Sequence, residues 1–235
     1  MPYRRSYRKR KRYPMRRRRG RYTLRKTVRQ VKRLKNAQER KIYTDNNTIA
    51  SIGNSSWNVQ NLNAIAVGDG RMQRNGDAIM MKYLHIQGIL TVVPESTIPA
   101  HVRIVVFLVK NDLSNNTGLI DESELFDTID EAGAVIVPTM LTPKNWANRY
   151  NIRTLYDVTH DLGAIANGTE NFVWATGNVS KTFHVRVGVN SQAQWIRNGT
   201  GNQKTKGLLV MAACTSSAGS AIQLRYMSRL TYTDN

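Results

Sequence analysis

The chain has a single cysteine, Cys214, and no long hydrophobic run among its 235 residues. One cysteine excludes an internal disulfide framework and a zinc site built from several cysteines. The longest apolar stretches, such as IVVFLV and GLLVMAAC, fall far short of the roughly 20 residues that cross a bilayer. The N-terminus also carries charge where a signal peptide would carry its apolar region, so we expect neither a membrane-spanning nor a secreted protein.

Acidic residues are almost absent from the first 41 positions. This segment holds 20 of the 35 lysines and arginines and one acid, Glu39, so it carries the whole net charge of +19. Residues 42–235 hold the other 15 bases and 15 acids and are electrically balanced. Solubility needs only a few charges, so a run of twenty predicts an arm that binds nucleic acid, joined to a neutral domain.

The first half of the arm, residues 1–22, is rich in arginine, with Tyr3, Tyr7, Tyr13 and Tyr22 set among the charges. Arginine pairs with phosphate through its planar fork and stacks on bases, and tyrosine offers a ring to an unpaired base. Because the charges repel one another, we expect this half to be disordered unless it is bound to a polyanion. Its runs RKRKR and RRRR also resemble nuclear-import signals.

The second half of the arm, residues 23–41, has an apolar residue at steps of four and three: Leu24, Val28, Val31, Leu34 and Ala37. This spacing predicts a basic amphipathic helix that packs its stripe on protein and offers its bases to phosphate. A helix on a membrane surface is the alternative, which the narrow stripe without aromatics disfavours. Across both halves, the residues expected to bind nucleic acid are Arg4, Arg5, Tyr7, Arg8, Lys9, Arg10, Lys11, Arg12, Tyr13, Arg16, Arg17, Arg18, Arg19, Arg21, Tyr22, Arg25, Lys26, Arg29, Lys32 and Arg33.

After Lys41 the chain consists of short β-branched and aromatic stretches separated by Gly, Asn, Pro and Ser, which indicates an all-β domain over 42–235. Within 181–190 the apolar residues alternate with polar ones, as in a half-buried strand. The long connections favour a sandwich over a tight barrel. The predicted strands are 42–52, 78–93, 101–111, 152–162, 181–190, 207–216 and 221–233, with 174–176 as a candidate for an eighth.

Residues 121–132, DESELFDTIDEA, predict a helix, with acids in its first turn and Gly133 just past its end. Leu125, Phe126 and Ile129 would form its apolar face. The six acids within 121–131 are also candidate calcium ligands, but their spacing lacks the glycine and the terminal glutamate of an EF-hand loop. We therefore favour a solvated helix or an interface surface and expect no metal.

No catalytic motif is present: the sequence lacks Gly-x-Ser-x-Gly, a Gly-Lys-Ser/Thr phosphate loop and His-Glu-x-x-His. The glycines of 68–77 have the wrong spacing for a phosphate loop and precede a strand, so we expect a turn there. His160 and Asp161, near Asp157, form the one cluster able to move a proton, and Cys214 is expected to be a buried small hydrophobe. The four histidines are scattered singly: His85, His101, His160 and His184. We expect no enzyme and no cofactor.

A tyrosine-containing arginine-rich arm on a strand-rich body resembles the capsid proteins of small eukaryotic viruses with circular single-stranded DNA, the circovirus- and geminivirus-like group. The opening MPYRRSYRKRKRYPMRRRRGRY is similar to circovirus arms. Segments 76–90, 150–162 and 181–190 resemble the sequences leading into the third, fifth and sixth strands of that group's jelly roll. The resemblance covers most of the chain by pattern, without a diagnostic motif, and the predicted helix of 23–41 departs from it.

This resemblance implies that the body is a single eight-stranded jelly-roll sandwich, and the spacing of apolar residues in 23–41 adds a partly helical basic arm before it. It further implies an icosahedral shell of sixty copies, an arm facing the lumen, entry into the host nucleus through the import machinery, and a packaged single-stranded DNA genome. Sixty copies with a net charge of +19 would bring about 1,100 positive charges, which matches the phosphates of a genome on the order of a kilobase. The protein would then be found in the virion and, during assembly, in the nucleus.

Three alternatives stay open. A small, satellite-like RNA virus would also use a jelly roll with a basic arm, because electrostatics hardly distinguishes RNA from DNA. A cellular structural nucleic-acid-binding protein is disfavoured because its folded part would normally be basic too. A carbohydrate-binding jelly roll would need exposed loop aromatics, for which Trp57, Trp146 and Trp195 are candidates, although we favour interface anchors for these three.

Overall fold

The computed structural model describes residues 26–31, 40–54, 56–93, 99–111, 113, 120–129, 133–136, 139–167, 173–196, 203–216 and 222–234. The chain divides into two compact units, residues 1–39 and 40–235. Regular structure in the second unit is almost entirely β-strand, so the prediction of an all-β body is confirmed.

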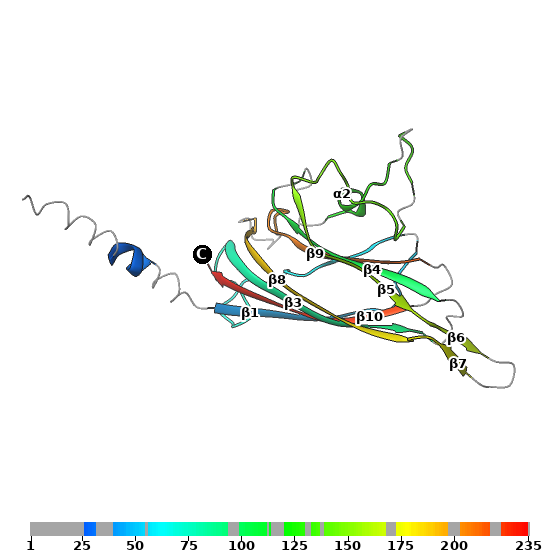
Figure 1. Cartoon of the computed structure of the whole chain (residues 1–235). Helices are drawn as coiled ribbons and strands as arrows, with labels where there is room; N and C mark the ends of the chain where they lie inside the picture. Colours follow the sequence, from blue (N-terminus) through cyan, green and yellow to red (C-terminus); the bar gives the residue numbers. More distant parts are fainter. Residues whose placement is uncertain are drawn as a thin grey trace, which may run out of the picture. The chain divides into compact units, whose positions relative to one another are not determined.

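The body consists of two four-stranded antiparallel sheets that lie one above the other (Figure 1). The first sheet has the order β1 (Arg40–Ile49), β10 (Ile222–Asp234), β3 (Ala78–Val92) and β8 (Ser180–Gln194). The second has the order β2 (Asn58–Asn61), β9 (Leu209–Thr215), β4 (Ala100–Val109) and β5 (Ile152–Leu162). A separate hairpin of β6 (Ala164–Asn167) and β7 (Val173–Thr176) extends from one end.

The strand order identifies the fold. Counted along the chain without the hairpin, the first sheet joins the first, eighth, third and sixth strands, and the second sheet joins the second, seventh, fourth and fifth. Two four-stranded sheets interleaved in this way form a jelly roll. The predicted eight-stranded jelly-roll sandwich is therefore confirmed.

The eighth strand of the sandwich is not the one that the sequence suggested. Residues 174–176 do form a strand, but β7 pairs with β6 alone. The missing sandwich strand is β2, whose sequence NVQN has four half-buried residues and pairs with β9 at the edge of the second sheet. A short polar edge strand carries no alternation of apolar and polar residues, so the pattern did not predict it.

The body begins two residues earlier than predicted, at Arg40 in place of residue 42, so the predicted helix of 23–41 is wrong at its C-terminal end. β1 begins at Arg40, which pairs with Thr233, and Lys41 pairs with Tyr232, so these two residues are strand. Cross-strand pairing with β10 is possible only in the extended conformation, and it overrides the helical spacing. Residues 26–31 are helical, as predicted, whereas 23–25 and 32–39 lie outside the described residues.

The predicted helix of 121–132 is also much shorter in the structure. α2 covers Glu122–Leu125, and Asp121 and Glu124 form a capping box at its start. Phe126 is extended and forms a β-bridge with Lys144. In this conformation its ring is buried in a hydrophobic cluster, which ends the helix before it. Ile129, expected on the apolar face, is exposed and bridges to Val135, while 130–132 lie outside the described residues.

The main core fills the space between the two sheets, with residues such as Leu84 and Ile86 of β3 facing Ile104 and Val106 of β4. A second cluster lies on the outer side of the second sheet, where Phe126 packs on Phe107 and stacks on Trp57 with ring centroids 3.8 Å apart. The second sheet is thus covered on both faces, which is why β9 is buried along its whole length.

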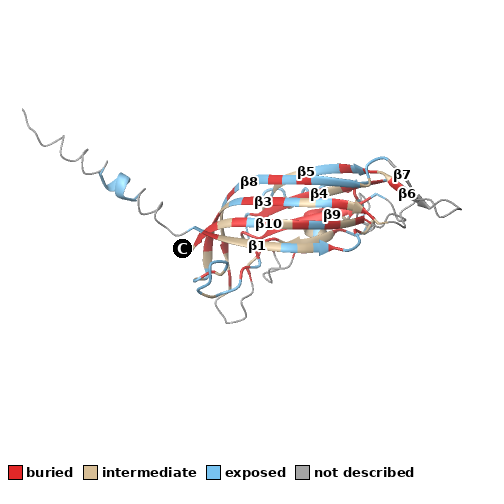
Figure 2. Cartoon of the chain, turned by 90° about the horizontal axis from the view of Figure 1, so that it is seen from below, coloured by how far each residue is buried: buried red, intermediate tan, exposed pale blue. Residues whose placement is uncertain are grey.

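Within the described part of the chain, other elements cover only one face of the first sheet. Buried and exposed residues alternate along β3, β8 and β10, as Figure 2 shows. Phe183, Val185 and Val189 point to the core, and His184 and Arg186 point to solvent, which confirms the alternation predicted for 181–190.

Candidate nucleic-acid interface

The described part of the arm is the helical segment 26–31, and all six of its residues are exposed. It contains two of the predicted nucleic-acid contacts, Lys26 and Arg29, which are three residues apart and therefore neighbours on the helix surface. Val28 and Val31 of the predicted apolar stripe are 59% and 46% exposed. The other eighteen predicted contacts lie outside the described residues.

The junction between arm and body is held by Lys41, whose side chain is 6% exposed. Its Nζ lies 2.8 Å from Asp234 Oδ2 and donates hydrogen bonds to Asn75 Oδ1 and to the carbonyl oxygen of Gln73. These contacts attach the start of β1 to the end of β10 and to the loop of residues 68–77. The arm is therefore joined to a fixed point of the body.

The same loop buries a second cation, Arg74, which is 2% exposed. Its guanidinium lies 4.3 Å from the ring centroid of Trp195 and donates from Nε to the carbonyl oxygen of Ile65. Burial lowers the pKa of Arg74, and Asp77 opposes that shift. Tyr232 donates its hydroxyl to Gln73, and burial raises the pKa of Tyr232 to about 12. Lys41 and Arg74 thus hold the loop, which is a turn as predicted, through contacts within the protein.

Asp157, part of the predicted proton-moving cluster, is engaged in a structural ion pair. Arg103 donates from two nitrogens to its two carboxylate oxygens at 2.8 Å, and Lys144 Nζ lies 3.1 Å away. The hydrogen bond from Arg103 is the main cause that lowers the pKa of Asp157. Arg103 also donates to the carbonyl oxygens of Met140 and Thr142, so this pair fixes the covering loop on the second sheet.

The other two members of that cluster, His160 and Asp161, have interaction partners other than Asp157. His160 is 8% exposed, lies 3.3 Å from the Tyr156 hydroxyl and packs near Phe183, and burial lowers its pKa. Asp161 is exposed and pairs with His101. His160 points to the opposite face of β5 from Asp157 and Asp161, and these two carboxylates are four residues apart, about 14 Å along the strand, so β5 does not bring the three groups together.

The remaining candidates also have structural surroundings. Cys214 is fully buried and its pKa is raised to about 11, mainly by burial, so it is a thiol at neutral pH. Trp57 and Trp195 are buried, and only Trp146 of the three candidate tryptophans is exposed, at 69%. Among the described residues, no three His, Cys, Asp or Glu side chains are grouped to hold a metal ion, and no helix is long and apolar enough to span a membrane.

No family model matches the chain, and no curated protein is similar to it. Among solved structures, that of Desmodium yellow mottle tymovirus is 10% identical with a TM-score of 0.30, over 83% of this chain and 87% of that chain. The 60-mer of the BFDV capsid protein is 9% identical with a TM-score of 0.27, over 84% of this chain and 93% of that chain. Likeness of this degree establishes no family, and the jelly-roll assignment rests on the strand order of this chain.

Proposed function

We propose that this protein is a viral capsid subunit whose body assembles into a closed shell and whose arm packages a single-stranded circular DNA genome. The observation that carries the proposal is the division of charge at Arg40. The arm, residues 1–39, has 18 bases and one acid, whereas the jelly-roll body, residues 40–235, has 17 bases and 15 acids.

The two parts have complementary physical roles. Jelly rolls occur in viral capsids, in lectins and in cupins, and an arm of this charge has a purpose in the first of these, where it neutralises a polymer that would otherwise repel itself. A nearly neutral body packs against further copies of itself without strong repulsion. Sixty copies, entry into the host nucleus and a virion location complete the proposal.

The arm is expected to bind with little sequence preference. Contacts to phosphate carry no sequence information, and stacking of tyrosine or arginine on bases tolerates any base. Packaging would therefore be coupled to assembly, because each copy that joins the shell brings its own share of the neutralising charge.

The test compares the full chain with a variant that begins at Arg40 and so keeps the Lys41 junction. Both are expected to form uniform shells in electron micrographs, and the absorbance ratio at 260 and 280 nm should show that the shortened shells lose most of their nucleic acid. A matched control replaces the lysines and arginines of residues 1–22 by glutamine at constant length, and it should behave like the deletion. A full chain that stays a nucleotide-free monomer at every ionic strength would refute the proposal.

Digestion of the co-purified polymer distinguishes the genome type. Degradation by DNase but not by RNase supports the proposed DNA genome. The reverse result points to the RNA-virus alternative, and irregular particles in place of uniform shells point to a cellular nucleic-acid-binding protein.

A further inference from the structure

The outer face of the first sheet is the one large strand surface of the body, within the described residues, that no other element covers. The cross-strand register arranges its side chains in rows that run over β1, β10, β3 and β8. Three successive rows are Thr44, Arg229, His85, Arg186; then Asn46, Met227, Gln87, His184; then Thr48, Arg225, Ile89, Thr182. We call these twelve residues the outer face.

The outer face contains cations and neutral groups but no acid. Arg186, Arg225 and Arg229 are exposed, and none of the ion pairs among the described residues involves them. This differs from the second sheet, where Arg103 is neutralised by Asp157. Three guanidinium groups without a carboxylate partner form a surface that attracts an anionic polymer.

The three arginines are spread over a distance that suits an extended polymer. Arg186 and Arg229 lie in the same row two strands apart, about 10 Å, and Arg225 lies four residues from Arg229 along β10, about 14 Å. A compact anion such as one phosphate cannot reach all three, whereas a strand of several linked phosphates can.

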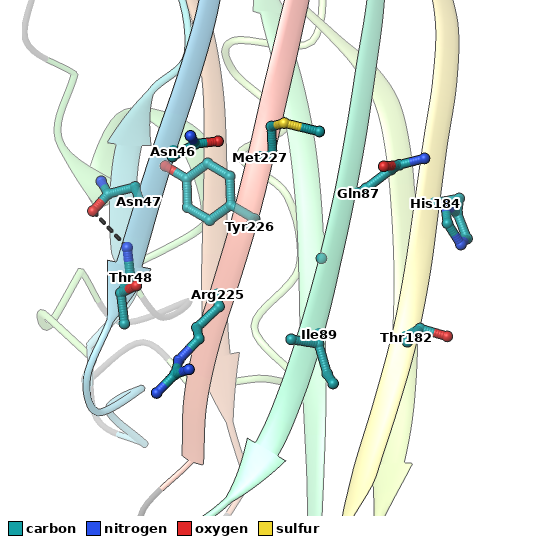
Figure 3. A pocket seen from close by; sticks show the side chains of 11 residues that line it. Asn46, Asn47, Thr48, Gln87, Ile89, Thr182, His184, Arg225, Tyr226 and Met227 are labelled. Atoms are coloured by element: carbon teal, nitrogen blue, oxygen red, sulfur yellow. Dashed lines mark hydrogen bonds between the residues drawn. The ribbon is translucent and has the colours of Figure 1, made fainter.

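Between the rows lies a hollow of about 450 Å³. Figure 3 shows Met227 and Gln87 along one border of the hollow and Arg225 and Ile89 along the opposite border. Its lining combines apolar side chains, on which a base packs, with the side-chain amides of Asn46 and Gln87, which offer both donors and acceptors to a base edge. The hollow therefore suits a nucleotide better than a purely apolar ligand.

We propose that the outer face is a second nucleic-acid-binding surface, on which Arg186, Arg225 and Arg229 hold the phosphates of a single strand and the hollow accepts one of its bases. β1, into which the arm leads, is the edge strand of this same sheet. Since arm and face belong to one chain, a strand held by the arm meets the face at a raised effective concentration.

This inference rests on the proposed nucleic-acid partner, and it is tested on the body alone, residues 40–235, so that the arm cannot mask the result. The probe is a fluorescent fifteen-residue oligothymidylate, and its binding is followed by anisotropy at low salt. The test variant combines Arg186→Gln, Arg225→Gln and Arg229→Gln, and we expect its affinity to fall at least tenfold. The slope of log affinity against log salt should fall by about 2, which is the loss of three phosphate contacts to a single strand.

The matched control removes the same charge from exposed residues elsewhere, Lys110→Gln, Arg149→Gln and Arg153→Gln. Its affinity should change less than twofold, and an equal loss in both variants would overturn the proposal, because net charge alone would then explain binding. A third variant, Gln87→Ala with Met227→Ala, tests the hollow: the affinity should fall several-fold at an unchanged salt slope, because these contacts are not ionic.

Two further results would contradict the proposal that the outer face binds nucleic acid, while leaving the capsid proposal intact. The first is a body that does not bind the probe although the full chain packages nucleic acid. The second is a test variant whose sedimentation changes while its affinity for the probe does not, since the face would then be a contact between copies. Circular dichroism spectra that match the unmodified body ensure that all variants are folded.

Discussion

Lys41 and Arg74 are cations that the fold buries, in contrast to the exposed arginines of the outer face. Their net contribution to stability depends on partners that replace water, because a buried charge without a partner costs several kcal/mol. Lys41 has a carboxylate, an amide oxygen and a carbonyl oxygen within 3.1 Å, and Arg74 has the carbonyl oxygens of Ile65 and Gly76 and the indole ring of Trp195. Both cations therefore stabilise the loop of residues 68–77.

Replacing Lys41 tests this role. Lys41→Ala leaves the Asp234 carboxylate, which is 23% exposed, without its partner. We expect the free energy of unfolding of residues 40–235 to fall by about 2 to 3 kcal/mol, as measured in urea. Arg40→Ala is the matched control: Arg40 is exposed, and its loss should cost less than about 0.5 kcal/mol. Equal effects of the two substitutions would show that the junction is not anchored by Lys41.

The lowered pKa of Asp157 predicts how the free energy of unfolding depends on pH. Its pKa in the folded protein is lowered, chiefly by Arg103, so it lies below the unfolded value of about 3.9. The stabilisation is fully present above the unfolded value and is lost as the pH falls through the folded value. In urea unfolding between pH 7 and pH 2, Asp157→Asn should remove part of this acid-induced loss. Asp161→Asn, at an exposed side chain, should leave most of it in place.

At the scale of elements, the second sheet shows how a long connection becomes part of the core. The described residues 120–129, 133–136 and 139–146 form neither a strand nor a long helix, yet they bury Leu125, Phe126 and Met140 against the outer side of β4 and β9. α2 ends after four residues because the extended conformation of Phe126 places its ring against Trp57 and Phe107.

Truncating Phe126 is expected to release this covering segment. Phe126→Ala removes a ring that is stacked on Trp57 and lies edge-on to Phe107, at a cost of about 3 to 5 kcal/mol. Fluorescence of the tryptophans should report the change along with urea unfolding. Ile129→Ala, at a side chain that is 59% exposed, serves as the control and should be near neutral. A similarly small effect at Phe126 would mean that the cluster does not hold the segment.

At the scale of the whole molecule, charge and fold are separated along the chain. The arm carries 18 of the 35 bases in 39 residues, whereas the body, with 17 bases and 15 acids, is nearly neutral. Strong electrostatic binding and weak self-repulsion are both obtained because different segments supply them.

This separation predicts a steep dependence of binding on salt. For the full chain and a single-stranded oligonucleotide, the slope of log affinity against log salt should be several units, and for residues 40–235 it should be far smaller. Titrations at several salt concentrations give both slopes. Equal slopes would contradict the role of the arm, because they would place the phosphate contacts in the body.

Much of the architecture follows from local patterns. Alternation in 181–190 located β8 and its two faces, since a period of two has one reading when one face is buried. The missed strand β2 and the shortened α2 have weaker signals, because their conformation is set by the neighbours β9 and Phe107 rather than by their own residues.

The sequence by itself determined the class of the body, the strongly basic arm with its single acid and the absence of familiar catalytic motifs, because composition and periodicity are properties of neighbouring residues. Only the tertiary structure decided that Arg40 and Lys41 belong to the sheet, that Asp157 and His160 have separate partners, and that Arg186, Arg225 and Arg229 share one face. These facts depend on pairing between strands that are far apart in the chain, and register between distant strands is fixed by packing rather than by local sequence.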